Sequence, residues 1–299
     1  NSMPGRVRYA RDFADGRRAE RPVGRQLNRL YAVESTPTVT GTLADHRLAI
    51  KASQVEDFAR ALADAVGLSV QKGSSSDIPE AWLSAIASDL RAHSGSSLVV
   101  AGEQQSPIVH ALAHAINDNL GNVGETVVYT APVIANSASQ GESLAALVEA
   151  MAAGTVELLL ILGANPVYNA PADLNFAGAL ESVGFSVHLG LWADETAVNC
   201  DWQIPQSHSL ESWSDARSYD GNVIIQQPLI EPLYASHSAH ELLDALLNEA
   251  PSSDHDIVKA FWTSQMGAVG IDVFWQKALH DGFVADSAWV PKAVSLQPT

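Results

Sequence analysis

Apolar residues in the central part of the chain occur in short unbroken runs, each followed by a loop and then by a stretch with helical spacing. The run at 158–162, Leu-Leu-Leu-Ile-Leu, is followed by the turn sequence Gly-Ala-Asn-Pro and then by a helical pattern. Strands buried on both faces need continuous apolar runs, and their alternation with helices implies right-handed crossovers. We therefore predict an α/β fold of the Rossmann-like class, in which a doubly wound, mainly parallel sheet carries helices on both faces in three layers.

The predicted elements follow from this periodicity. In the central part we expect strands near 98–101, 125–130, 157–162 and 185–190, with helices at 106–121, 142–154, 171–184 and 194–200. Before it we expect a strand at 27–35, a loop at 36–47, a helix at 53–67 that opens with a Ser53 and Glu56 capping box, and a helix at 80–90. After it we expect a strand at 222–228, a helix at 238–250 with a Ser238 and Glu241 capping box, and helices at 254–265 and 272–282.

Charge is distributed unevenly along the chain. The first 29 residues contain eight of the 17 basic residues and carry a net charge of +5, although the whole chain carries −17. Between Arg91 and Lys259 the only basic residue is Arg217. Such an acidic body repels phosphate backbones, which argues against nucleic-acid binding.

These features divide the chain into four predicted segments. Residues 1–26 form an Arg-rich extended arm that packs against acidic surface, and residues 27–95 form an N-terminal α/β segment. Residues 96–250 form the Rossmann-like core. Residues 251–299 form C-terminal helices and a tail.

Three further observations limit the class of protein. Cys200 is the single cysteine, which excludes an internal disulfide and any cluster held by several cysteines within these residues. No window approaches the ~18 consecutive apolar residues of a membrane-spanning helix. The first residues lack the apolar core of a secretory signal. We expect a soluble fragment of a longer protein.

The loops that follow the strands are the places where such sheets bind ligands. The loop Ala-Gly-Glu-Gln-Gln at 101–105 precedes a predicted helix and could present backbone donors to an anion. In the loop at 163–166, Gly163 permits close backbone approach, and Asn165 is held out of the α region by Pro166. The spacing is equally compatible with a ligand site and with a plain connection. No dinucleotide or P-loop glycine motif is present.

Other reactive side chains are better explained by structural roles. His110 and His114 are one helical turn apart but lack the glutamate of a zinc-protease motif, and His237 and His240 flank a helix start. The acidic neighbour Asp201 would raise the pKa of Cys200 and make it a poor thiolate. The cluster of Ser207, His208, Ser209 and Glu211 lacks a nucleophile-elbow motif, and we assign no catalytic pair among Asp194, Glu195, Asp201, Glu211, Asp215 and Asp220.

Taken in order, several stretches resemble the later part of the molybdopterin oxidoreductase (dimethyl sulfoxide reductase-like) family. They are residues 98–124, 158–180 and 194–215, followed by Tyr-Asp-Gly at 219–221 and by residues 226–234. A hallmark of that family is Ala-Asp, two hydrophobic residues, Leu-Pro, and then Glu and Gly. Residues 200–205 read Cys-Asp-Trp-Gln-Ile-Pro and are followed by Glu211. With residues 27–50 included, the chain is most similar to the molybdopterin-like half of the fused iron-sulfur subunit of alternative complex III.

The resemblance implies that the strand-end loops line a crevice for the molybdenum cofactor. The residues that would line it, whether the crevice is vestigial or real, are Gly102, Gln104, Gly163, Asn165, Pro166, His208 and Glu211. The family's N-terminal cysteine cluster and its metal-ligating residue are not identifiable in this chain. Residues 92–258 carry a net charge of −19, which opposes the anionic pyrophosphates of the cofactor. We therefore expect neither a metal ligand nor catalysis in this fragment, and an empty pocket.

The resemblance also implies a cellular location and a set of partners. It suggests an oxidoreductase-family scaffold in a membrane-bound respiratory electron-transfer complex, on the periplasmic side, without direct membrane insertion. The expected partners are other subunits and an iron-sulfur domain elsewhere in the full-length chain. Two alternatives stay open: a domain that binds molybdopterin guanine dinucleotide in a catalytic oxidoreductase, and a Rossmann-type module that binds a small molecule.

Overall fold

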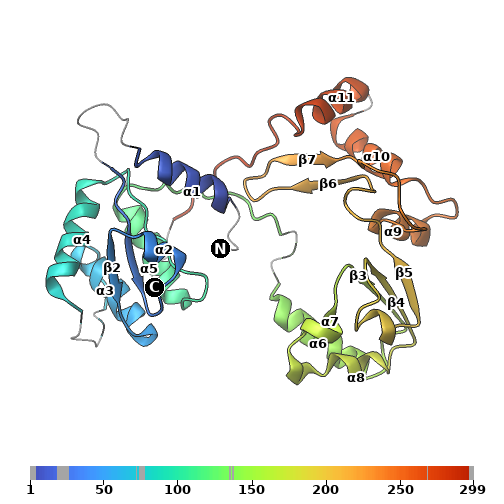
Figure 1. Ribbon diagram of the computed structural model, residues 1–299, viewed down its shortest axis with the longest axis horizontal. Helices are drawn as coiled ribbons and strands as arrows, with labels where there is room; N and C mark the ends of the chain where they lie inside the picture. Colours follow the sequence, from blue (N-terminus) through green and yellow to red (C-terminus); the bar gives the residue numbers. More distant parts are fainter. Residues whose placement is uncertain are drawn as a thin grey trace. The chain divides into compact units, whose positions relative to one another are not determined.

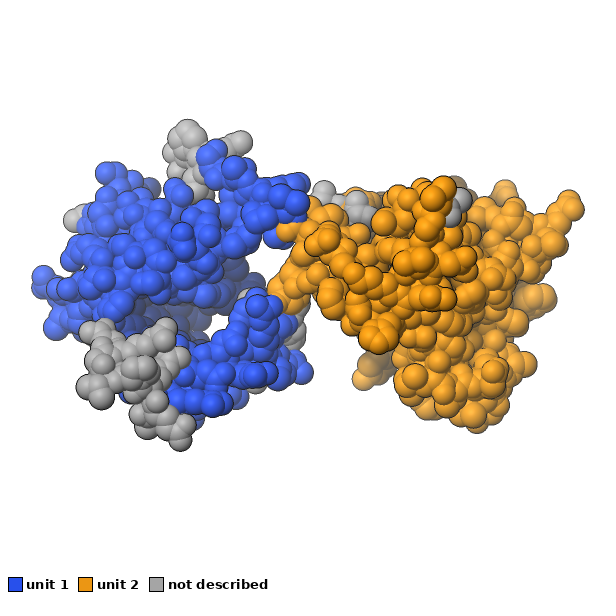
Figure 2. Space-filling view, turned by 90° about the horizontal axis from the view of Figure 1, so that it is seen from above, with its two compact units in different colours: residues 1–130, 290–299 blue, residues 131–289 orange. Residues whose placement is uncertain are grey.

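The computed structural model describes residues 5–18, 27–71, 73, 78–134, 136, 138–267 and 269–295. The chain forms two compact units, one of residues 1–130 with 290–299 and one of residues 131–289 (Figures 1 and 2). The boundaries that we predict near residues 95 and 250 each fall inside one of these units. No helix in the described part of the chain is long and apolar enough to cross a membrane.

The first unit contains a two-stranded parallel sheet and the helices packed on it. Strand β1 (Tyr31–Glu34) pairs with β2 (His46–Ala49), so that Tyr31 lies opposite His46. The connection contains the short helix α2 (Val39–Leu43), where we predict a loop. The core helices of this unit are α3 (Val55–Ala65), α4 (Glu80–Ala92) and α5 (Pro107–Asn119). Their buried faces supply Phe58, Leu62, Ile86, Leu112 and Ile116.

The start of α3 differs from the prediction in its cap. The helix begins at Val55, after a 3-10 turn over Ala52–Gln54, and no side chain caps it. The Gln54 side chain instead accepts a hydrogen bond of 3.0 Å from the backbone N–H of Lys51. The Ser53 and Glu56 capping box is therefore wrong, because Ser53 lies inside the 3-10 turn and the residue that precedes the helix is Gln54.

The N-terminal arm is helical where we predict an extended segment. Helix α1 (Arg6–Asp15) buries none of its side chains. It carries Arg8 and Asp12 at 3.8 Å, and Arg11 and Asp15 at 3.9 Å, each pair one helical turn apart. Such pairs stabilise an exposed helix by a few tenths of a kcal/mol each. Residues 19–26 of the predicted arm lie outside the described residues.

The apolar runs at 98–101 and 125–130 form no strand, contrary to our prediction, apart from an isolated bridge between Val123 and Val127. The buried Asn117 of α5 explains the first case. Its side chain accepts a hydrogen bond from the N–H of Val99 at 2.9 Å and donates one to the carbonyl of Val99 at 2.7 Å. The backbone groups that would pair with a neighbouring strand are therefore bonded to a helix side chain.

The second unit contains a three-stranded parallel sheet in the order β3-β4-β5, formed by β3 (Leu158–Leu162), β4 (Phe185–Gly190) and β5 (Trp202–Pro205). Leu159 and Ile161 of β3 pack against helices α6 (Gln140–Ala152) and α8 (Phe176–Leu180). The predicted helix over 171–184 is reduced to a 3-10 turn at Ala172–Leu174 and α8, because Asn175 between them has a left-handed φ of 49°. The predicted helix at 194–200 is only the 3-10 turn Ala197–Asn199.

The rest of the second unit is an antiparallel hairpin with three helices. Strands β6 (Ser214–Arg217) and β7 (Val223–Gln226) pair with each other. Helix α9 (Ala239–Leu247) opens with the predicted capping box of Ser238 and Glu241. It is followed by α10 (Asp254–Met266) and α11 (Ile271–Asp281), whose Trp262 and Trp275 are buried in a core with Val223 and Ile225.

The predicted fold class is confirmed. The chain is a mixed α/β protein with parallel sheets and helices on both sides, which is consistent with a Rossmann-like fold (Figure 1). The strands of the described residues are divided among three small sheets. The predicted apolar runs at 157–162 and 185–190 are both strands of the parallel sheet in the second unit.

Candidate functional site

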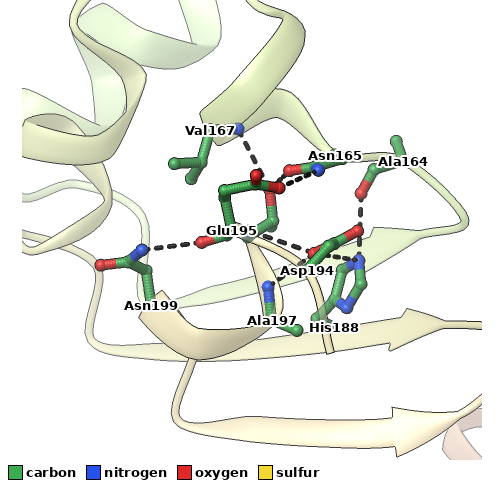
Figure 3. A network of polar contacts seen from close by, with 9 residues as sticks. Ala164, Asn165, Val167, His188, Asp194, Glu195, Ala197 and Asn199 are labelled. Atoms are coloured by element: carbon green, nitrogen blue, oxygen red, sulfur yellow. Dashed lines mark hydrogen bonds and ion pairs between the residues drawn. The ribbon is translucent and has the colours of Figure 1, made fainter. Parts of the chain in front are cut away.

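The loops after β3 and β4 leave the same edge of the parallel sheet and meet there (Figure 3). Gly163 ends β3 with a left-handed φ of 64°, and its N–H donates to the carbonyl of Leu189 on β4 at 2.8 Å. A Cβ atom at this position would lie 3.3 Å from the Gln206 side chain, just after β5. The glycine therefore brings the three strand ends together, as we expect for a loop that needs close backbone approach.

Asn165 is the centre of the polar network at this edge. Its amide nitrogen donates to a Glu195 carboxylate oxygen at 2.7 Å, and its carbonyl oxygen accepts from the Thr196 hydroxyl at 2.7 Å. The same hydroxyl oxygen accepts from the N–H of Val167 at 3.0 Å. The loop after β4 is thereby bonded to the loop after β3, over a sequence separation of about 30 residues.

The two carboxylates in the loop after β4 have defined structural roles. Asp194 accepts hydrogen bonds from the N–H groups of Thr196 at 3.1 Å and Ala197 at 2.9 Å, and so caps the turn. The hydrogen bond from Asn165 lowers the pKa of Glu195, which favours its ionised form. Both groups therefore place negative charge at this edge of the sheet.

His188 is a buried histidine at the carboxyl end of β4, only 1% exposed. Its Nε2 lies 3.0 Å from the carbonyl oxygen of Ala164 and 3.9 Å from Asp194 Oδ1. Because a carbonyl can only accept, Nε2 carries a proton in this hydrogen bond, and no hydrogen-bond partner for Nδ1 is found within the described residues. The sequence analysis did not select His188, although a histidine inside an apolar strand is the signal that could have identified it.

Gly190 provides the space for that imidazole. A Cβ atom at Gly190 would lie 2.3 Å from Cε1 of His188, which is closer than atoms can pack. The pair of His188 and Gly190 is therefore a matched feature of β4, in which the small residue accommodates the ring two positions earlier.

His208 and Glu211 form a separate turn after β5. One Glu211 oxygen accepts from the N–H of His208 at 2.8 Å, and the other accepts from the N–H of Leu233 at 3.1 Å. These backbone donors, that of His208 first, lower the pKa of Glu211. Nδ1 of His208 accepts from the N–H of Leu210 at 3.1 Å. Glu211 thus connects the turn at 208–211 to the loop that contains Leu233.

The remaining residues of the predicted crevice are Gly102, Gln104 and Pro166. Gly102 and Gln104 are exposed residues of the first unit, in a turn before α5 in which the N–H of Gln105 donates to the carbonyl of Gly102 at 3.0 Å. Pro166 is the first residue of the four-residue helix α7 (Pro166–Asn169) in the second unit. The structure brings together Gly163, Asn165 and Pro166 on one loop.

Several of the other reactive side chains that the sequence analysis considered have protein partners. Burial, and then the charge of Asp201, raises the pKa of Cys200, in the predicted direction. His114 Nδ1 lies 2.8 Å from the Tyr129 hydroxyl, and His240 Nε2 lies 3.1 Å from the Ser214 hydroxyl. Within the described ranges, no group of three or more His, Cys, Asp or Glu side chains could hold a metal ion. Further pairings join Ser207 to Ser236, His237 to Glu241, Asp201 to Ser186, Asp215 to Trp262, and Asp220 to Ser218 and Asn222.

The strand-end residues do not fit a cofactor that carries a pyrophosphate. The first N–H of α7 is absent because residue 166 is proline, and the N–H of Val167 is bonded to Thr196. The Asn165 side-chain amide, another donor in this loop, is bonded to Glu195. A phosphate would therefore meet two carboxylates at a position where the Val167 and Asn165 side-chain donors are already used, which electrostatics opposes.

The comparisons with known proteins give little beyond this geometry. No protein-family model matches the chain. No curated protein matches it either. Among solved structures the chain is similar to acetylene hydratase from Pelobacter acetylenicus, with 15% sequence identity and a TM-score of 0.44. The match covers 73% of this chain and 42% of the acetylene hydratase chain, so this chain spans less than half the length of that protein.

Proposed function

We propose that this chain is part of a molybdopterin oxidoreductase-family protein and acts as a non-catalytic scaffold domain in a membrane-associated respiratory electron-transfer complex. The proposal starts from the sequence resemblance of residues 98–124, 158–180 and 194–215 to that family. In this proposal Gly102, Gln104, Gly163, Asn165, Pro166, His208 and Glu211 are the remnants of a cofactor crevice.

The main support for a non-catalytic role is that the polar groups at the strand ends form hydrogen bonds with one another. Asn165, Thr196 and Glu195 bond to one another. Glu211 uses both carboxylate oxygens to connect two loops. Groups that hold a charged cofactor need donors directed at the ligand. Here the donors are directed at neighbouring loops, so these residues stabilise the fold.

The expected partners are other subunits of the complex and an iron-sulfur domain elsewhere in the full-length protein. Residues 131–289 contain 20 acidic and three basic residues, which favours basic protein surfaces over nucleic acid or anionic lipid. Exposed aromatic residues in the same unit, such as Trp192 and Tyr234, give it further contact area. We further propose, from the sequence resemblance alone, that the assembled protein lies on the periplasmic side of the membrane.

The cofactor content of the purified chain tests this proposal. We expect no molybdenum or tungsten by elemental mass spectrometry and no pterin fluorescence after denaturation. We also expect no heat of binding in calorimetry with GDP, a probe for the nucleotide half of the cofactor. Stoichiometric metal with pterin fluorescence would establish the catalytic alternative. GDP binding without either signal would favour a small-molecule binding module.

A further inference from the structure

A half-open groove of about 360 Å³ lies in the second unit, between β5 and the helices that follow it. It does not include the strand-end residues described above. Ile204 of β5 contributes one wall, Leu242 and Ala245 of α9 contribute another, and the segment at 251–253 completes the lining. The volume is within the range of roughly 300 to 1,000 Å³ typical of small-molecule sites.

The lining combines apolar side chains with a polar group of His237 and Glu241. Ile204, Leu242, Ala245 and Pro251 supply the apolar surface. One Glu241 oxygen accepts from the N–H of Ser238 at 2.8 Å and lies 3.7 Å from Nδ1 of His237. The other Glu241 oxygen makes no hydrogen bond within the described residues. Its carboxylate therefore keeps a free acceptor at the side of an apolar groove.

The charge around the groove is negative. Asp244 stands one turn further along α9 and accepts from the N–H of Ser252, which lines the groove, at 2.6 Å. None of the described lining residues is Lys or Arg. Elsewhere in the unit, Lys259 is paired with Asp272 at 2.9 Å, and Arg217 lies over the Trp289 ring at 4.4 Å.

We propose that this groove binds a small organic cation, an ammonium group carried on an apolar body. The apolar part would lie on Ile204, Leu242 and Pro251. The ammonium group would replace water at the free Glu241 oxygen and form a charge-assisted hydrogen bond. An anion of the same shape would be repelled by Glu241 and Asp244, and a neutral analogue would gain the apolar contact alone.

The test uses three probes of one shape with the full chain: n-hexylammonium, hexanol and hexanoate. Binding is followed by chemical-shift changes in ¹H–¹⁵N spectra. We expect saturable binding of n-hexylammonium with shifts at residues 237–245, weaker binding of hexanol and none of hexanoate. Raising the salt concentration should weaken only the hexylammonium interaction, because screening acts on the charge pair. Equal binding of the three probes, or none of hexylammonium, would overturn the proposal.

Two substitutions separate the charge from the shape of the groove. Glu241→Gln keeps a side chain that can complete the capping box but removes the charge, and it should weaken hexylammonium binding about fivefold while leaving hexanol unaffected. Ala245→Trp fills the groove from an exposed helix position and should abolish binding of both. Glu149→Gln, an exposed site on α6, makes the same charge change away from the lining and should have no effect. A similar loss with Glu149→Gln would mean that net charge alone attracts the amine and would contradict the site.

Discussion

Gly190 determines whether the His188 imidazole can occupy its buried position at the end of β4. The ring uses one nitrogen to bond the loop after β3, and the other has no partner among the residues that the structure describes. A buried polar atom without a hydrogen bond destabilises the folded state. This loss accompanies the hydrogen bond by which the same ring joins the two loops. Sequence alone could not reveal the arrangement, because it depends on a carbonyl oxygen 24 residues away.

Gly190→Ala should destabilise the second unit by about 1–3 kcal/mol, because the new methyl group overlaps the imidazole. The same substitution should cost much less in a His188→Ala background, where the ring is absent, so the two changes should be strongly non-additive. Chemical denaturation of the four proteins measures the coupling. Gly141→Ala, at an open position in α6, is the matched control and should be neutral or stabilising. Additive effects of the two substitutions would refute the packing explanation.

Glu211 gives the second unit a component of acid sensitivity. Its pKa is lowered in the folded state by backbone N–H donors, so its stabilisation is complete above the unfolded value, near 4.3, and is lost as the pH falls through the lowered folded value. Glu211→Gln should lower the melting temperature at neutral pH, because His208 and Leu233 donate to different carboxylate oxygens and the amide nitrogen that replaces one of them cannot accept. Melting curves should show the difference between the two proteins shrinking below about pH 4.3. A difference that stays constant down to pH 2 would show that the ionised carboxylate is not responsible.

At the scale of elements, hydrophobic periodicity predicts the strands and helices that depend only on neighbouring residues or on burial. The apolar runs of β3 and β4 and the capping box of α9 are readable because each depends on neighbouring residues or on burial alone. The run at 98–101 looks the same in sequence. It forms no strand because a single helix side chain, Asn117, bonds its backbone. The loop at 163–166 was readable as a turn, but its partners Glu195 and Thr196 were not, since they lie about 30 residues further along.

Asn117 should therefore hold the 98–101 segment on α5 through Val99. Asn117→Ala leaves the N–H and carbonyl of Val99 without those partners and should destabilise the first unit by about 1–3 kcal/mol. Asp118→Ala, at the exposed neighbouring position of the same helix, should change stability by less than about 0.5 kcal/mol. Hydrogen exchange should show faster exchange at the Val99 amide in Asn117→Ala only. Equal effects of the two substitutions would contradict this role.

At the scale of the whole molecule, the two units differ most in charge. Residues 131–289 contain 20 acidic and three basic residues and so carry the full net charge of −17, whereas the acidic and basic residues of the first unit balance. A chain with that much charge of one sign is destabilised by self-repulsion. The second unit is therefore the part whose stability should depend on ionic strength.

Tryptophan placement allows this difference to be measured. Trp82 is the single tryptophan of the first unit, and the other six of the chain's seven lie in the second. In a Trp82→Phe variant, fluorescence therefore reports the second unit alone.

Raising sodium chloride from 0.05 to about 0.5 M shortens the screening length to a few ångströms and should move the urea midpoint of that signal upward. Far-ultraviolet circular dichroism, which detects the helices of both units, should show a smaller shift in the part that belongs to the first unit. A fluorescence midpoint that does not respond to salt would mean that the acidic side chains of residues 131–289 are too well separated to repel, and would remove the electrostatic reason for a basic partner.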